Sequence, residues 1–491
     1  MGHRDLFING AWVTGDGPAL HSRGPNGDDL VWSGTEALPG EIDLAVDSAR
    51  RAFGGWSQTS FEQRIEIAKR FAERIKRHSS VFARLISREM GKPLWEAYTE
   101  VAAVAGKVDV TIDAYRTRCG SAEELNNDVR GETWYRPLGA LGVLGPFNLP
   151  AHLPNGQIVP ALLAGNTIVF KPSELTPAVG EMLVDQWREA DLPAGVINLV
   201  QGGPKSAEHL ARHPQLDGLL FTGSYRVGLE LSKWYGAFPE KMLALEMGGN
   251  NPLVVDRVRD LDAAALLVVQ SAYITSGQRC TCARRLIVVD SPESDEFLEV
   301  LGRWIDRIDV GLFDQEPEPF LGPVVSLGAA ERLLAAQSRL IEQGARSLRV
   351  MRQVGVHPAV LAPGLIDVTD VPHRLDEEWF GPLLQVIRVS SWEAALDEAN
   401  RTRFGLAAGL LSDDANRFQE FRRRVRAGVL NWNRATTGAS ARMPFGGLGA
   451  SGNHRPAGYH AVDFCADAVA SSQSETLTLP QKLPTGIRAA N

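Results

Sequence analysis

Cysteine is scarce in this sequence and forms no pattern that would cross-link a fold. Only four cysteines occur among 491 residues, at positions 119, 280, 282 and 465, which is too few and too scattered for a disulfide framework. The spacing in Cys280-Thr281-Cys282 is neither that of a redox motif nor that of a zinc pair. We therefore predict a reducing compartment, the cytoplasm, and no metal ligands.

Long apolar runs and blocks of like charge are also missing. No apolar stretch reaches the roughly 18 residues that a membrane span requires, and residues 1–6 contain no apolar secretion segment. The net charge is −8 and the pI is near 5.8, without a run of about five like charges. We expect neither a membrane nor a nucleic acid as a partner.

What is present is the composition of a large globular protein. Hydrophobic residues make up 44% of the chain, charged residues 22%, and the mean hydropathy is −0.12. A chain of 491 residues exceeds the size of about 250 to 300 residues at which a single core stops growing. We therefore expect two or more domains.

The first part of the chain mixes strands, turns and helices. Asn9-Gly10 between apolar residues predicts a hairpin within the short strands and turns of residues 1–55. Ser60 and Gln63 form a capping-box pattern, followed by apolar residues at helical spacing. A second helix is expected over about residues 80–90, because Gly91-Lys92-Pro93 would end it.

From about residue 130 the sequence alternates short β-rich runs with helical segments. Continuous apolar strands separated by helices indicate parallel sheets covered on both faces. We predict an α/β fold with two doubly wound parallel-sheet domains, the first of them nucleotide-binding. The runs lie at 140–144, 167–170, 196–200, 218–221 and 242–245, and then at 252–255, 286–289, 384–389 and 429–432.

Cys280 is the candidate nucleophile. It lies on a Gly-bounded turn beside Arg279 and off any periodic apolar face. The reactive form of cysteine is the thiolate, which a nearby positive charge favours. The alternative is that Cys280 and Cys282 are small core residues, since free cysteine is usually buried.

Five other segments follow strand runs, where ligands of open parallel sheets bind. They carry an amide at Asn148, a Lys171/Glu174 pair, a glycine turn at 221–228, a carboxylate at Glu246, and a tight turn at 377–382. Taken singly, each has a simpler interpretation. The glycine turn is no GxGxxG fingerprint and would then only cap a helix, Glu246 would end a strand, and 377–382 would be an ordinary turn.

Together and in this order, the five segments and Cys280 resemble the NAD(P)-dependent aldehyde dehydrogenases. The resemblance runs over almost the full length, from the Asn-Gly hairpin to residues 444–447. The matching motifs are Lys-Pro-Ser-Glu at 171–174, Phe-Thr-Gly-Ser at 221–224, Leu-Glu-Met-Gly-Gly at 245–249, Gly-Gln-Arg-Cys at 277–280 and Glu-x-Phe-Gly-Pro at 378–382.

The resemblance implies an aldehyde dehydrogenase-like subunit of three parts, including a small β oligomerisation element. Members of the family are usually dimers or tetramers, so we expect a homo-oligomer. The parts are expected at 1–124 and 142–245 for the NAD-binding domain, 246–428 for the catalytic domain, 125–141 and 465–491 for the oligomerisation element, and 429–464 for a substrate-facing loop that returns to the cofactor domain.

The resemblance also implies the catalytic roles. Cys280 would be the nucleophile, Glu246 the general base and Asn148 the oxyanion donor. An aldehyde cannot release hydride until a nucleophile has added to its carbonyl, and a thiolate adds readily to give a thiohemiacetal. The thioester left after hydride transfer needs water, which Glu246 can activate if a dry site raises its pKa toward neutrality.

For the cofactor, Lys171 and Glu174 resemble a clamp on the adenosine ribose, and Glu378 and Phe380 the pair that holds the nicotinamide ribose. A carboxylate at Glu174 would repel a 2′-phosphate and accept ribose hydroxyls, so we predict NAD rather than NADP. The pyrophosphate turn that the resemblance implies comprises Gly223, Ser224, Tyr225, Arg226, Val227 and Gly228.

Within the family, segments 150–156, 279–285, 431–439 and 451–456 resemble the bacterial succinylglutamate-semialdehyde dehydrogenases of arginine catabolism. This implies NAD-dependent oxidation of N-succinyl-L-glutamate 5-semialdehyde to N-succinyl-L-glutamate. Such a substrate carries two carboxylates, which guanidinium groups bind in a bidentate manner. The candidates are Arg442 and Arg455, with Arg434 nearby, although each is also typical of a surface arginine.

Other functions stay open at this point. One is oxidation of another acidic aldehyde, such as succinic or glutamic semialdehyde. Branches of the family that acylate coenzyme A or use phosphate resolve the thioester without a base, and Glu246 argues against them. A non-catalytic binding or structural protein with the same fold is disfavoured because Cys280, Glu246, Asn148 and Lys171 are all present.

Overall fold

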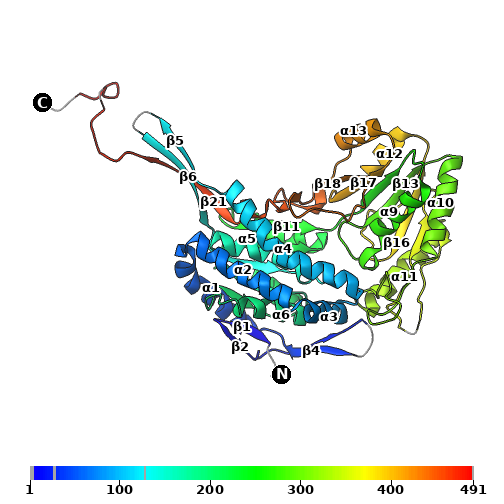
Figure 1. Ribbon diagram of the computed structural model, residues 1–491, viewed down its shortest axis with the longest axis horizontal. Helices are drawn as coiled ribbons and strands as arrows, with labels where there is room; N and C mark the ends of the chain where they lie inside the picture. The colour runs from blue at the N-terminus through cyan, green and yellow to red at the C-terminus, as the bar shows by residue number, and fades with distance from the viewer. Residues whose placement is uncertain (1–4, 26–28, 127–128, 356, 481, 489–491) are drawn as a thin grey trace.

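Two α/β lobes lie side by side, and a narrow β arm projects from the amino-terminal lobe (Figure 1). This computed structural model describes residues 5–25, 29–126, 129–355, 357–480 and 482–488. Some positions of the expected parts fall outside the described residues: 1–4 and 26–28 of the cofactor domain, 356 of the catalytic domain, and 127–128, 481 and 489–491 of the oligomerisation element.

The sheet of the first lobe has the strand order β11-β10-β7-β8-β9-β1-β2. Its first five strands in this order pair in parallel, and β1 and β2 add an antiparallel edge. The strands β7 and β8 are buried at every residue, which explains their uninterrupted apolar character. The strands are β1 (Leu6–Ile8), β2 (Ala11–Val13), β7 (Ala140–Leu144), β8 (Thr167–Lys171), β9 (Ile197–Leu199), β10 (Gly218–Gly223) and β11 (Met242–Met247).

Local sequence signals set the boundaries of several elements in this lobe. Asn9 and Gly10 have φ values of 53° and 82°, as a two-residue hairpin turn requires. Helix α2 begins at the predicted capping box, where Ser60 Oγ accepts a hydrogen bond from the Gln63 backbone N–H. Helix α3 ends at Gly91, whose φ of 90° is left-handed.

Eight helices and a separate hairpin are described around this sheet. The helices cover both of its faces, with α2 to α6 packed in one apolar cluster and α1, α7 and α8 in the other. They are α1 (Pro39–Gln58), α2 (Phe61–Arg77), α3 (Ser79–Met90), α4 (Leu94–Arg118), α5 (His152–Ala164), α6 (Pro177–Arg188), α7 (Pro204–Ala211) and α8 (Tyr225–Tyr235), and the hairpin consists of β3 (Ala19–Arg23) and β4 (Leu30–Thr35).

The sheet of the second lobe has the strand order β14-β15-β16-β13-β12-β17-β18. All pairs are parallel except β14 with β15. Three of its strands, β14, β15 and β17, are absent from the sequence prediction. The elements are β12 (Asn251–Val255), β13 (Ala283–Val289), β14 (Arg346–Arg349), β15 (Gly364–Asp367), β16 (Leu383–Val389), β17 (Ala407–Leu411) and β18 (Val429–Trp432), with helices α9 (Leu261–Tyr273), α10 (Pro292–Ile305), α11 (Leu327–Glu342), α12 (Trp392–Ala399) and α13 (Ala415–Arg424).

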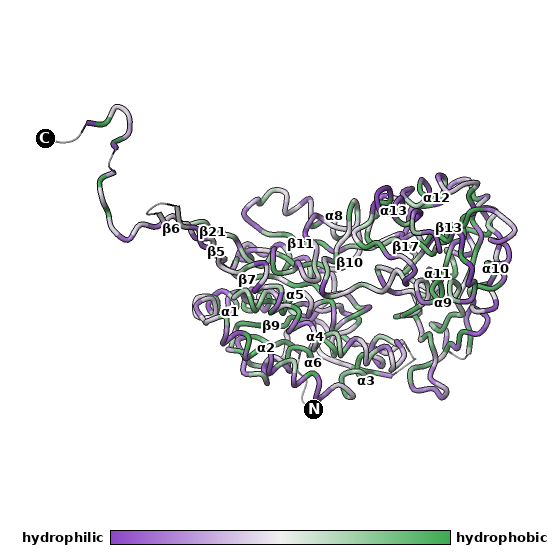
Figure 2. Tube along the Cα trace, turned by 45° about the horizontal axis from the view of Figure 1, so that its top comes forward, coloured by the Kyte–Doolittle hydropathy of each residue, from purple (hydrophilic) through white to green (hydrophobic). Residues whose placement is uncertain are grey.

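The arm is a three-stranded antiparallel sheet of order β21-β6-β5. Strand β21 (Ala466–Gln473) pairs with β6 (Val129–Pro137), which also pairs with β5 (Ala122–Asn126). Beyond β21 the chain continues as an extended tail that leaves both lobes (Figures 1 and 2). Among the helices of the described chain, none combines the length and apolar character needed to cross a bilayer.

The carboxyl-terminal stretch returns to the space between the lobes before it enters the arm. A small hairpin of β19 (Pro444–Phe445) and β20 (Ala457–Gly458) lies there, with the short helices η2 (Gly449–Ser451) and η3 (Ala461–Phe464). A bridge between Glu246 and Gly452 joins this stretch to the end of β11. The end of β11, the start of β13 and this hairpin therefore meet in one place.

Candidate active site

The loop that carries Cys280 has an unusual backbone conformation. It follows η1 (Ile274–Gly277), in which Thr275, Ser276 and Gly277 have φ values of 57°, 54° and 72°. A Cβ atom at Gly277 would lie 2.1 Å from the backbone oxygen of Gly381. Glycine is therefore required for the loop to approach the 377–382 turn, and the approach fixes Cys280 relative to that turn.

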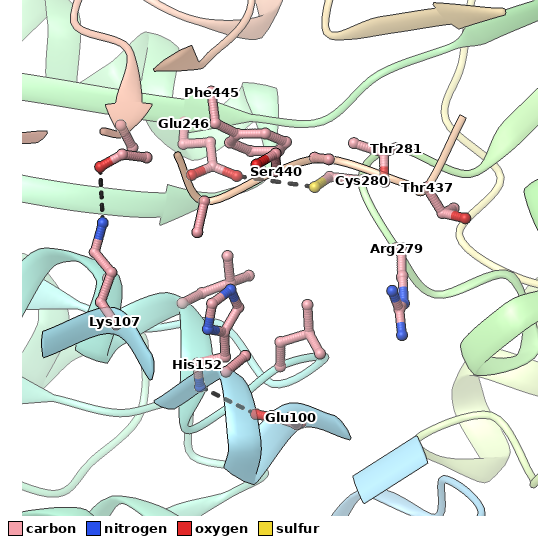
Figure 3. A pocket seen from close by; sticks show the side chains of 18 of the residues that line it. Glu100, Lys107, His152, Glu246, Arg279, Cys280, Thr281, Thr437, Ser440 and Phe445 are labelled. Atoms are coloured by element: carbon pink, nitrogen blue, oxygen red, sulfur yellow. Dashed lines mark hydrogen bonds between the residues drawn. The ribbon is translucent and has the colours of Figure 1, made fainter. Parts of the chain in front are cut away.

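Cys280 lies where two cavities meet. The first has a volume of about 290 Å³ and the second of about 510 Å³. Glu246 and Leu153 line both cavities, as Cys280 does. Figure 3 shows the first cavity, with Cys280 and Glu246 on one side of it and His152 and Glu100 on the other. A group bound in either cavity would reach the sulfur from its own side.

The sulfur and the predicted base are direct neighbours. Cys280 Sγ donates a long hydrogen bond to Glu246 Oε1 at 3.8 Å (Figure 3). Burial raises the pKa of Glu246 to about 7, and burial, followed by the nearby Glu246 carboxylate, raises the pKa of the Cys280 thiol well above its usual range. Glu246 Oε1 is therefore the hydrogen-bond acceptor that the structure places next to the Cys280 thiol.

Arg279 acts on the pKa of the Cys280 thiol in the predicted direction, lowering it, but larger effects outweigh it. Its Nη2 lies 2.8 Å from Glu96 Oε1, and the Glu96 side chain is wholly buried. The carboxylate offsets the guanidinium charge, and burial together with Glu246 outweighs the effect of Arg279 on the pKa of Cys280. The sequence shows that Arg279 is next to Cys280, but it does not show that Arg279 pairs with Glu96.

Asn148, the predicted oxyanion donor, is buried beside the cysteine loop. Its Nδ2 donates to the backbone oxygen of Gln278 at 2.9 Å, and the residue lines the second cavity. Lys92 Nζ donates to the backbone oxygen of Asn148 at 2.8 Å. Glu100, which pairs with Lys92, accepts from the Ala151 backbone N–H at 2.9 Å. The amide is thus held in place from several directions.

The second cavity brings together the four residues predicted for the two riboses. Lys171, Glu174, Glu378 and Phe380 all line it. Lys171 Nζ lies 4.0 Å from Glu174 Oε2, and burial lowers the pKa of Lys171 to about 8. Burial raises the pKa of Glu378 to about 7, and this carboxylate accepts a 3.1 Å hydrogen bond from the Gly249 N–H.

Only part of the predicted pyrophosphate turn faces the second cavity. Gly223, Ser224 and Val227 line it, and Ser224 caps α8 by accepting from the Val227 N–H at 3.4 Å. The helix therefore presents its amino-terminal end to the cavity, where backbone N–H groups and the helix dipole suit an anion.

The other residues of that turn are not among those that line the cavity. The Arg403 guanidinium lies over the Tyr225 ring, with its Cζ atom 4.9 Å from the ring centre. A Cβ at Gly228 would lie 2.3 Å from Met247 Sδ, so this glycine allows α8 to pack on β11. Arg226 is exposed on α8. These residues shape or flank the turn and are not brought to the second cavity.

The predicted substrate arginines are not brought to the first cavity. Arg442, Arg455 and Arg434 are exposed, and none is among the residues that line it. The Arg442 side chain is 65% exposed and its Nη1 lies 3.4 Å from Asp113 Oδ2. The basic side chains that do line the cavity are Lys107, Arg279 and His152.

Two buried polar residues that the sequence analysis did not single out hold the cysteine loop. Asn251 Nδ2 donates to the backbone oxygens of Cys280 and Cys282, at 2.7 and 2.8 Å. Arg284 is fully buried, and its Nη2 donates to the Arg279 backbone oxygen at 2.9 Å. Their signal in the sequence is a polar side chain just before an apolar run, Asn251 at the start of β12 and Arg284 near the start of β13.

The sequence profile of the aldehyde dehydrogenase family matches residues 12–469. The chain belongs to the aldehyde dehydrogenase family. Among similar members, the N-succinylglutamate 5-semialdehyde dehydrogenase of Burkholderia ambifaria is 52% identical over 98% of this chain and 99% of its own length. The protein of that name from Pseudomonas fluorescens is 50% identical over 99% of both chains.

Solved aldehyde dehydrogenase structures have the same fold. The 1-pyrroline-5-carboxylate dehydrogenase from Thermus, solved with bound NAD, superposes with a TM-score of 0.90 at 30% identity, over 96% of this chain and 93% of that one. The NAD-dependent aldehyde dehydrogenase from Sinorhizobium meliloti superposes with a TM-score of 0.91 at 27% identity, over 98% and 96%. The predicted fold class and family are thereby confirmed.

Proposed function

We propose that this aldehyde dehydrogenase oxidises N-succinyl-L-glutamate 5-semialdehyde to N-succinyl-L-glutamate with NAD, as a step of arginine catabolism. The observation that carries the chemistry is the position of Cys280, between two cavities and 3.8 Å from Glu246. The names of relatives about half identical over nearly the whole chain support the substrate.

The first step is addition of the Cys280 sulfur to the aldehyde carbon. Glu246 Oε1 is the acceptor nearest the thiol and takes its proton. The thiolate then forms a C–S bond to the carbonyl carbon, and the carbonyl oxygen takes up the electron pair as an oxyanion. The product is a thiohemiacetal anion attached to the protein.

Asn148 and the Cys280 backbone N–H are proposed to bind that oxyanion. One N–H of the Asn148 amide is used by Gln278, and a primary amide carries a second one. One such donor contributes about 3 to 4 kcal/mol at comparable sites. The Lys92–Glu100 pair positions the loop, so the donor is held before the charge develops.

The second cavity fits NAD by its chemistry. Lys171, Glu174 and Glu378 offer a buried cation and carboxylates for ribose hydroxyls, and the amino-terminal end of α8 offers N–H groups for a pyrophosphate. A nicotinamide bound there would supply a hydride acceptor, so that the thiohemiacetal on Cys280 could lose the hydride of its former aldehyde carbon and become a thioester. Glu174 next to Lys171 favours NAD over NADP, because a 2′-phosphate would meet its carboxylate.

Glu246 is proposed to act again in the hydrolysis of the thioester. With its pKa raised to about 7 by burial, it is a base matched to neutral pH. After it has passed the thiol proton to solvent, the Glu246 carboxylate takes a proton from a water molecule whose oxygen attacks the thioester carbon. The C–S bond breaks, the sulfur is released and the carboxylic acid leaves.

We also propose the oligomeric state, the domain division and the location expected from the sequence. The projecting β21–β6–β5 sheet with its tail, where Leu477 and Leu479 are exposed, is suited to pair subunits into a dimer or tetramer. Residues up to 245, apart from the arm, would bind NAD, and residues 246–428 would form the catalytic domain. Four free cysteines favour the reducing cytoplasm.

The test is an assay of NADH absorbance over a panel of aldehydes, with Cys280→Ala as the inactive control. The panel holds N-succinylglutamate 5-semialdehyde, succinic semialdehyde, glutamic semialdehyde and an uncharged aldehyde. We expect the highest kcat/KM for the succinylated compound. A higher kcat/KM for another acidic semialdehyde would overturn the proposed substrate but not the cysteine mechanism. Activity in Cys280→Ala would overturn the mechanism.

A further inference from the structure

Lys107 is a buried charge on the face of α4 that lines the first cavity. Thr99, Ala103 and Lys107 follow one another at intervals of four residues and all line the first cavity. Lys107 is 3% exposed, and the neighbouring buried positions Val104 and Val108 are apolar. A buried lysine is costly unless its charge has a partner, so its presence on this face calls for a function.

The charges around the first cavity are balanced except at Lys107 and Glu246. Arg279 pairs with Glu96 at 2.8 Å, and Glu100 pairs with Lys92 at 2.6 Å. His152 contributes no charge at neutral pH, because burial lowers its pKa to about 4. Within the described chain, the hydrogen bond that Lys107 makes is to a neutral group, the Gly458 backbone oxygen at 2.7 Å.

The geometry points to Lys107 as a substrate-binding residue: we propose that its ammonium group binds a carboxylate of the aldehyde substrate and so selects acidic aldehydes. This inference rests on the proposed function and specifies how the first cavity recognises that substrate. In Figure 3, Lys107 and Arg279 lie on opposite sides of the cavity, with Cys280 and His152 between them. An acidic chain extending from the reacting carbonyl toward α4 would meet Lys107.

The ammonium group retains hydrogen-bonding capacity for such a ligand. It has three N–H groups, and Gly458 takes one of them. Burial lowers the pKa of Lys107 to about 8, as expected for a cation without a carboxylate partner. A bound carboxylate would supply that partner in a nearly dry site, where a charge-assisted hydrogen bond is strong.

Lys107 also donates a hydrogen bond to Gly458 in β20, so the test must separate an effect on substrate binding from an effect on folding. Lys107→Gln removes the charge but keeps an N–H donor for Gly458, and Lys107→Met removes both. Lys76→Met is the matched control, since it removes one lysine charge from an exposed site on α2. Each variant is assayed with N-succinylglutamate 5-semialdehyde and with hexanal, and its thermal unfolding is measured.

The readout is the ratio of kcat/KM for the succinylated aldehyde to that for hexanal. We expect this ratio to fall about 10- to 100-fold in Lys107→Gln, the range for loss of a charge-assisted hydrogen bond, mainly through KM. Lys107→Arg is expected to recover part of it, and Lys76→Met to keep it. If Lys107→Met unfolds, Lys107→Gln still gives the ratio.

The possible outcomes separate this inference from the proposed function. If wild type prefers the succinylated aldehyde and Lys107→Gln keeps the same ratio, Lys107 does not bind the carboxylate and the inference is wrong. An equal loss for both aldehydes would also overturn it, because it would indicate a structural role only. If wild type shows no preference for acidic aldehydes, the proposed substrate itself fails.

Discussion

Lys92 Nζ lies 2.6 Å from Glu100 Oε2, and no solvent reaches either side chain. The two partners hold one loop at different residues along it. Lys92 binds the backbone oxygen of Asn148, and Glu100 accepts from the backbone N–H groups of Ala151 and His152. The Lys92–Glu100 pair, which no sequence motif indicates, therefore positions Asn148, the predicted oxyanion donor.

We expect Lys92→Met to be strongly destabilising and poorly active. It leaves the Glu100 carboxylate buried without its partner, which typically costs about 3 to 5 kcal/mol, and it frees the carbonyl of Asn148. Denaturant unfolding and kcat would measure both effects. The control is Lys233→Met, because Lys233 pairs with Glu230 at an exposed site and should change stability by less than about 0.5 kcal/mol. A stable, fully active Lys92→Met would contradict the role of the pair.

Glu246→Gln should separate the two halves of the reaction. Hydride transfer can still occur when another acceptor takes the thiol proton slowly, but the thioester then lacks its base. We expect a burst of about one NADH per subunit followed by a steady rate at least about 100-fold below wild type. Rapid mixing with absorbance detection would show the burst. Steady turnover without a burst, at the wild-type rate, would exclude Glu246 as the base.

The pH dependence of the wild-type rate should report the same carboxyl group. Burial raises the pKa of Glu246 to about 7, and only the deprotonated form is a base. The steady rate is therefore expected to be low below pH 7, to rise through about pH 7 and to level off above it. A profile already flat from pH 5 upward would show that the group titrates elsewhere.

Glu174→Gln should narrow the preference for NAD over NADP. The substitution removes the charge that would repel a 2′-phosphate but keeps an acceptor for ribose hydroxyls. Lys171 is only 4.0 Å away and would become available to the phosphate. The measurement is kcat/KM for both dinucleotides at a fixed aldehyde concentration. An unchanged ratio would count against the clamp.

Gly277→Ala should inactivate the protein through the backbone. A Cβ there would lie 2.1 Å from the Gly381 oxygen, in addition to the strain of a left-handed φ. We expect a loss of about 100-fold in kcat/KM, because the cysteine loop must shift. Gly344→Ala is the matched control, since Gly344 is also left-handed but has no atom within 4 Å of the added Cβ. It should lose about 1 to 2 kcal/mol of stability and keep its activity.

The sequence predicted strands well where they are apolar and continuous, and missed those that are not. Strand β17 reads Ala-Ala-Gly-Leu-Leu, which has little intrinsic preference for β structure. It forms because β12 and β18 pair with it on either side. The edge strand β14, Arg-Ser-Leu-Arg, is too short and polar to stand out. Both are set by tertiary pairing rather than by local preference.

The site was predictable where function depends on short contiguous motifs. Cys280, Glu246 and Asn148 come from such motifs, and the structure brings all three to one place. The substrate side was not predictable in this way. Arginine was expected from the chemistry of carboxylates, but sequence does not reveal which basic side chains face inward, and Arg442 and Arg455 face solvent. Lys107 reaches the cavity only because α4 packs against α5.

That Cys280 lines both cavities has a consequence for inhibition. A single compound with a carboxylate arm in one compartment and a nicotinamide-like ring in the other would have to pass the sulfur. If the atom that connects the two parts is an electrophilic carbon, the Cys280 sulfur would form a covalent bond to it while each end of the compound is bound in its own cavity. The architecture thus provides a template for selective bisubstrate inactivators.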